Sequence, residues 1–130
     1  MTSWNDVVNV IRAGYEVAVD EIDHLWLVFN LDDTRSQTVH LWRQTLVDGG
    51  EEWVQIESPF GRIGEGDAVS ALREVGDMVC GGVATLGDML VLRHSVPLAN
   101  VDLSEIERPL RLVVLSADRL ERLYTGVDEF

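Results

Sequence analysis

The chain has 130 residues and a formal net charge of −13, and all ten of its basic residues are arginines. Such an acidic surface repels nucleic-acid phosphates and anionic lipid headgroups, which argues against nucleic acid and membrane surfaces as partners. The hydrophobic content of 46% and charged content of 25% are typical of a folded protein, so we expect one domain over residues 1–130.

The first half of the sequence predicts a helix followed by three strands. Ser3 can cap the helix and Gly14 can end it, with an apolar stripe formed by Val7, Val8, Val10 and Ile11. Residues 15–20 look extended, and strands are predicted near 24–31, 38–47 and 52–58. Residues 48–50 (Asp-Gly-Gly) are a strong hairpin signal. Because the connections are short, we expect an antiparallel meander.

The second half predicts two helices separated by a hairpin. After a loop over residues 59–66, Asp67 can cap a helix at about 68–80, and strands near 83–86 and 89–95 follow. The last helix begins around Ser104, and its apolar stripe contains Leu103, Ile106, Leu110, Val113, Ala117, Leu120 and Tyr124. The order α-β-β-β-α-β-β-α predicts an α+β fold with an antiparallel sheet and three helices.

The two faces of the predicted sheet are both rich in apolar residues. One face, expected to pack under the last helix, carries Leu25, Leu27, Phe29, Leu31, Val39, Leu41, Val54 and Ile56. The opposite face carries Trp26, Val28, Trp42 and Trp53. A second face is normally polar, and each Trp offers roughly 150–250 Å² of surface. Something must therefore cover this face: the second helix, a second copy of the chain, or a protein client.

Four segments carry a resemblance to a known family: RSQTV at 35–39, WVQIESP at 53–59, LRHSVPL at 92–98 and SADRL at 116–120. With the element order, they resemble the YbjN family, which shares the fold of class I type III secretion chaperones. The resemblance covers nearly the whole chain. It implies a small α+β domain, often dimeric, with a chaperone-like or protein-binding role. No secretion-specific motif accompanies it, so a secretion role is not carried over.

No motif for catalysis or metal binding is found in the sequence. His24, His40 and His94 stand far apart, without His-x-x-x-His or Cys-x-x-Cys spacing. The glycines of residues 61–66 lack the spacing of a phosphate-binding loop. Cys80, the single cysteine, is expected to be a buried structural thiol and excludes an intrachain disulfide. We therefore expect a non-enzymatic protein without a metal or cofactor.

Arg35 and Gln37, at the start of the second predicted strand, allow two interpretations. They could bind the backbone or a carboxylate of a partner at the rim of the sheet. The favoured alternative is that Arg35 pairs with Asp32 or Asp33 in its own turn while Gln37 only begins the strand.

Together these features predict a protein-binding module with a chaperone-like fold. Its expected partners are a second copy of itself and an unidentified protein or peptide. Its predicted binding residues are Trp26, Val28, Trp42, Trp53, Arg35 and Gln37. The alternative is a small-ligand-binding protein or an enzyme, with a pocket between the sheet and the last helix. The N-terminal residues lack a signal-peptide pattern and no apolar run approaches about 20 residues, so we expect a cytoplasmic location.

Overall fold

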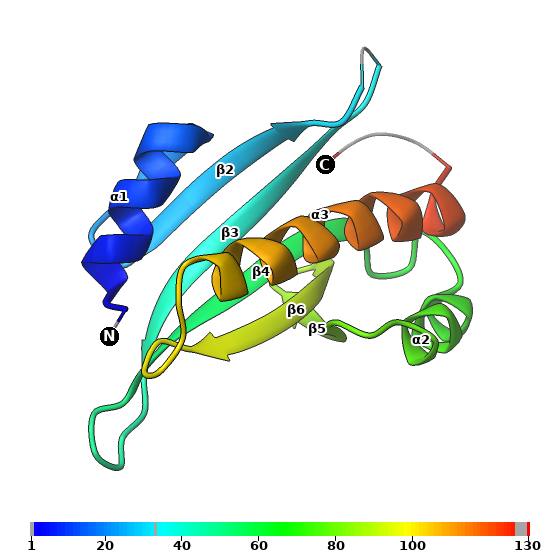
Figure 1. The fold of residues 1–130 in the computed structure, drawn as a ribbon. Coiled ribbons are helices and arrows are strands. Elements are labelled where there is room, and N and C mark those ends of the chain that lie inside the picture. The colour runs from blue at the N-terminus through cyan, green and yellow to red at the C-terminus, as the bar shows by residue number, and fades with distance from the viewer. Residues whose placement is uncertain (1, 33, 127–129) are drawn as a thin grey trace.

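Six strands and three helices make up the computed structural model, in which residues 2–32, 34–126 and 130 are described. The helices are α1 (Trp4–Gly14), α2 (Ala68–Gly76) and α3 (Ser104–Tyr124). The strands are β1 (Glu16–Asp20), β2 (His24–Asn30), β3 (Ser36–Thr45), β4 (Glu52–Arg62), β5 (Gly82–Leu86) and β6 (Met89–Pro97). Figure 1 shows their arrangement.

The strands form one antiparallel sheet with the order β1-β2-β3-β4-β6-β5. Strands β1 to β4 are the predicted meander, extended by one strand, and the β5–β6 hairpin adds to its far side. The α+β class is confirmed, with the element order α-β-β-β-β-α-β-β-α. The added strand, β1, is only five residues long and pairs with β2 around an irregularity between Val17 and Val19. It lies within residues 15–20, which the sequence predicted to be extended without assigning them to the sheet.

Two predicted boundaries differ from the structure by more than two residues. Strand β4 runs past Pro59 to Arg62, where a loop was expected, because this part pairs with β6 around a bulge between Pro59 and Gly61. Helix α2 ends at Gly76 instead of near residue 80, so Cys80 lies beyond it and is nevertheless buried. The predicted caps are present, since Ser3 forms a capping box with Asp6 and Asp67 accepts from Val69 and Ser70.

The helices lie on one side of the sheet, as Figure 1 shows for α1 and α3. Helix α3 crosses β3, β4 and β6, while α2 packs against α3 and the edge strand β5. The predicted core face is confirmed: Leu25, Leu27, Val39, Leu41, Val54 and Ile56 are fully buried, and Phe29 and Leu31 are partly buried. None of the described helices is long and apolar enough to cross a membrane. The opposite face of the sheet has no described helix on it.

Candidate functional site: an aromatic open sheet face

Side chains of β2, β3 and β4 line up on the helix-free side of the sheet, which we call the open face. The register pairs His24 with Trp42 and Trp26 with His40. On the other side of β3 it pairs His40 with Glu57, Trp42 with Gln55 and Gln44 with Trp53. Because alternate residues of a strand share a face, the central open-face residues are Trp26, Val28, His24, His40, Trp42, Trp53, Gln55 and Glu57. The open face is thus a continuous patch across three strands.

Four aromatic rings of the open face stack on one another. The rings of His24 and Trp42 are nearly parallel, with centroids 3.7 Å apart, and His24 and His40 stack at 5.1 Å. Trp26 stacks on His40 at 5.2 Å. Since these rings cover each other's faces, they do not present a bare platform of the kind on which sugars or nucleobases stack. The patch suits contact with another apolar protein surface better than it suits a stacked ligand.

The two histidines at the centre of the open face are kept neutral at neutral pH. Nε2 of His24 lies 2.8 Å from Nδ1 of His40, so one imidazole donates a hydrogen bond to the other. Burial, reinforced by the charge of His24, lowers the pKa of His40 to about 4. Burial also lowers the pKa of His24, against the opposing effect of Glu21 and Glu57. The centre of the open face therefore carries no histidine charge under physiological conditions.

The remaining charges at the centre of the open face compensate each other. Glu57 is 2% exposed and accepts a hydrogen bond from Nη2 of Arg93 on β6 at 3.1 Å. The patch is therefore close to neutral in a chain whose formal net charge is −13. The indole N–H groups of Trp42 and Trp53 are buried and have no acceptor among the described residues. Such donors cost about 1–3 kcal/mol each when they stay unpaired.

The structure brings together four of the six predicted binding residues. Trp26, which is 36% exposed, lies on the open face beside half-buried Val28, Trp42 and Trp53. His40 shares this face because it lies two residues before Trp42 in the same strand. The pairing of Glu57 with Arg93 joins residues 36 positions apart and has no local signal.

Arg35 and Gln37 lie apart from the open face, on the side that α3 covers. Nε of Arg35 donates to Asp118 of α3 at 2.8 Å, and Nη2 lies 3.5 Å from Glu121. In its own turn, the Arg35 backbone N–H donates to Asp32, while Asp33 is outside the described residues. Gln37 is fully buried, and its Nε2 donates to Ser58 and to the Pro59 carbonyl. The two side chains thus belong to a buried polar cluster at the start of β3.

Helix α2 does not cover the open face, although the sequence allowed that arrangement. It packs instead against α3 and β5. Its apolar residues Val69 and Leu72 are each 54% exposed, so α2 offers a second, smaller apolar surface. Burial raises the pKa of the Cys80 thiol just beyond this helix, which keeps it protonated and unreactive.

A shallow groove is present between the sheet and α3, the place where the sequence suggested a ligand pocket. It holds about 250 Å³ and is lined by Tyr15, Phe29, Leu31, Arg111, Val114 and Leu115. The lining is mostly apolar, and its ionisable residues are Tyr15, whose hydroxyl donates to Glu107 at 2.7 Å, and Arg111. Among the described residues, no three His, Cys, Asp or Glu side chains are grouped so that they could hold a metal ion.

Comparison with known proteins does not connect the chain to a characterised relative. No model of a known protein family matches the sequence, and no curated protein matches it either.

Proposed function

We propose that this chain is a non-enzymatic protein-binding module that binds through its open face, and that one of its partners is a second copy of itself. The observation that carries the proposal is that Trp26, Trp42 and Trp53 share a sheet face on which no described helix lies. A chain of this size normally places its helices over its most apolar sheet surface. Here the three tryptophans are left for an intermolecular contact.

Charge supports a self-contact through this face. Two copies that each carry a formal charge of −13 repel each other over most of their surfaces. The centre of the open face is the exception, because its histidines are neutral and Glu57 is paired with Arg93. A two-fold contact places this one patch against its own copy. Covering apolar surface stabilises such a contact by about 25 cal/mol per Å².

The resemblance to the YbjN family and to class I type III secretion chaperones supports a wider, chaperone-like role. On this proposal the domain also binds a protein or peptide client, and it does so in the cytoplasm. No catalytic residue or cofactor is invoked.

Sedimentation equilibrium at micromolar concentration tests the self-association. The wild-type chain should sediment as a dimer, and Trp42→Glu should give the 14.5 kDa monomer because it places a charge in the stacked rings. Leu72→Glu puts the same charge on α2 and should leave the dimer intact. Circular dichroism confirms that each variant is folded, and Trp26→Glu replaces Trp42→Glu if the latter unfolds.

A wild-type monomer contradicts the self-association. A dimer that survives both Trp variants but is lost in Leu72→Glu moves the interface to α2. Client binding is tested separately by affinity capture on folded wild-type bait with Trp42→Glu as the matched control. Proteins that bind both baits equally well count against the open face as the client site.

The groove of Tyr15, Phe29, Leu31, Arg111, Val114 and Leu115 supports a second candidate function, the binding of a small apolar ligand. Its volume of about 250 Å³ is near the lower limit for ligand sites, which makes this the weaker candidate. An environment-sensitive apolar dye should bind wild type, and Leu115→Trp, which adds bulk at an exposed lining position, should weaken the signal. Dye binding that Leu115→Trp leaves unchanged would show that the dye binds elsewhere.

A further inference from the structure

The β3–β4 ladder stops early, and the reason is a proline. Its pairs run from Thr45 with Glu52 to His40 with Glu57, and the same register would next place Thr38 opposite Pro59. Proline has no backbone N–H to donate. Instead, Oγ of Ser58 donates to the Thr38 carbonyl at 2.6 Å, and the Pro59 carbonyl accepts from Gln37. Because the Pro59 carbonyl accepts from the Gln37 side chain, the Thr38 N–H is not paired with β4, and the two strands open into a fork.

Residue Phe130 fills this fork. Its carbonyl accepts from the Thr38 N–H at 2.8 Å, and its own N–H donates to Oε2 of Glu121 at 2.9 Å. Its ring lies beside the guanidinium of Arg62, with 5.3 Å from Cζ to the ring centroid. Figure 1 marks this end of the chain beside β3, near the start of that strand. Phe130 is thus held by a backbone donor (the Thr38 N–H), a side-chain acceptor (the Glu121 carboxylate) and a cation–π contact with Arg62.

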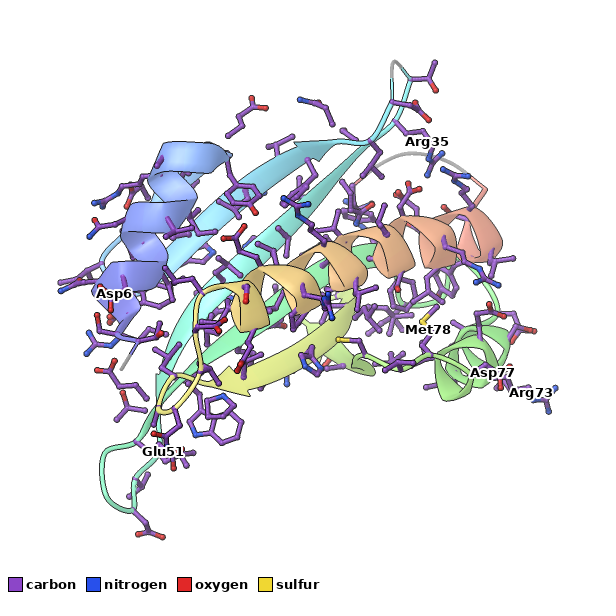
Figure 2. All side chains as sticks on the ribbon, in the orientation of Figure 1. Asp6, Arg35, Glu51, Arg73, Asp77 and Met78 are labelled. Carbon is purple, nitrogen blue, oxygen red and sulfur yellow. The ribbon has the colours of Figure 1, made fainter. Side chains whose placement is uncertain are left out.

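The fork is lined by polar groups that are unusually well buried. Glu121 and Gln37 are fully buried and Asp118 is 4% exposed, and Arg35 lies against both acids. Figure 2 labels Arg35 at this end of the molecule. The Gln37 Oε1 is buried without a hydrogen-bond partner. Burying charged and amide groups costs several kcal/mol unless they are paired. A strand can end without such a buried polar cluster, so the cluster calls for another explanation.

We propose that this fork is a binding slot for a peptide segment that carries an aromatic residue, and that Phe130 occupies it in cis as a tethered ligand. The Thr38 N–H and the Glu121 carboxylate bind the backbone of the segment, as in strand addition, and Arg62 binds the aromatic ring. Arg35 is a positioning residue, since it fixes the acids of α3. The inference rests on the proposed protein-binding function, for which it names a peptide class, but it uses a surface separate from the open face.

A competition between residue 130 and a free peptide tests the slot in the full-length chain. The probe is a fluorescein-labelled peptide with the sequence of residues 126–130, followed by anisotropy. Phe130→Pro removes the N–H that Glu121 accepts, so the tethered residue should leave the slot. Phe130→Ala keeps this N–H and is the matched control. A tethered segment competes at roughly millimolar effective concentration, so Phe130→Pro should bind the peptide at least about tenfold more tightly than wild type.

Two further measurements locate the binding. In NMR spectra of Phe130→Pro, the backbone amide signal of Thr38 should shift when peptide is added. The double variant Phe130→Pro/Glu121→Gln should bind the peptide at least about fivefold more weakly than Phe130→Pro. The slot is refuted if the folded Phe130→Pro variant binds no more tightly than wild type, or if the Thr38 signal does not move. Since the open face is intact in every variant, dimerisation should persist, so failure of the slot is distinguishable from failure of the open-face proposal.

Discussion

At the residue scale, the protonation of the His24–His40 pair determines the net charge at the centre of the open face. The two rings share one hydrogen bond at 2.8 Å and stack against Trp42 and Trp26. A proton added to either ring would lie among aromatic side chains. Glu21 and Glu57 favour a proton on His24, whereas burial opposes it and has the larger effect on the His24 pKa. On His40, burial opposes the proton, and a charge on His24 would oppose it further. Arg93, which pairs with Glu57, weakens the carboxylate's attraction further.

The low pKa of His40 predicts that acid destabilises the fold. Between its folded pKa of about 4 and the unfolded value of 6.5, the unfolded chain binds more protons. The free energy of unfolding therefore falls as the pH is lowered through this window. The wild-type protein should lose free energy of unfolding between pH 7 and pH 5. After allowance for the partial solvent exposure of His40, we expect this loss to be smaller by about 1 kcal/mol in His40→Gln. Urea unfolding at both pH values measures this, and parallel losses in the two proteins would contradict it.

Gly61 is another residue whose role depends on its surroundings. A Cβ added to it would lie 2.2 Å from Cδ1 of Tyr124, whose hydroxyl donates to the Arg62 carbonyl. Gly61→Ala should therefore destabilise the protein by about 1–3 kcal/mol through overpacking. Removing the ring with Tyr124→Ala should relieve most of that cost, so the double variant should be more stable than additivity predicts. Gly14→Ala, with no atom within 4 Å of its added Cβ, is the control.

At the scale of elements, α3 packs on strands of both the β1–β4 meander and the β5–β6 hairpin. Its apolar stripe is buried over β3, β4 and β6, and its polar side places Asp118 and Glu121 over the start of β3. One helix therefore supplies both the core and the acids of the fork. The opposite surface of α3 remains exposed, with Leu115 at 57% and Leu123 at 62%.

Burial within α3 predicts which of its leucines matter for stability. Leu120 is fully buried, so Leu120→Ala should cost about 2–5 kcal/mol through lost burial and a cavity. Leu123→Ala, three residues further along the same helix, should cost less than about 0.5 kcal/mol because its side chain is exposed. Denaturant unfolding compares them. Similar losses in both variants would mean that the helix is rotated relative to this structure.

At the scale of the whole molecule, the open face lies within a strongly acidic chain. The described helices are on one side of the sheet, so no described helix has to move before a partner can reach the exposed side chain of Trp26 on the open face. The charge of −13 opposes the approach of a second copy, while the neutral centre of the open face favours contact once the copies are close. Association thus depends on a balance between long-range repulsion and short-range burial.

This balance predicts that salt strengthens the proposed dimer. Raising NaCl from about 10 mM to about 100 mM shortens the Debye length from about 30 Å to about 10 Å and screens the repulsion between copies. The dissociation constant should fall severalfold, as measured by sedimentation equilibrium at each salt concentration. A dimer that weakens with salt would instead be held by ion pairs, which the central open-face residues do not supply.

Much of the fold was predictable because its signals are local. The alternation of Leu25 to Leu31 and of Val39 to Trp42 assigned residues to two faces, and Ser3 and Asp67 marked helix starts through their own side chains. The tryptophan-rich face followed from the same alternation. The pattern also placed the last helix over the core face, but it left open where the second helix packs, since that depends on the path of the chain in space.

The sequence by itself determined the α+β class, the meander, the core face and the tryptophan-bearing face, because residue periodicity and caps act over a few positions. Tertiary structure alone decided that α2 packs beside α3 and leaves the open face bare. It also decided that Arg35 reaches Asp118, 83 residues away, and that Phe130 closes the fork at Thr38. These contacts join distant segments, and their energies depend on burial and geometry that exist only after the sheet and helices have assembled.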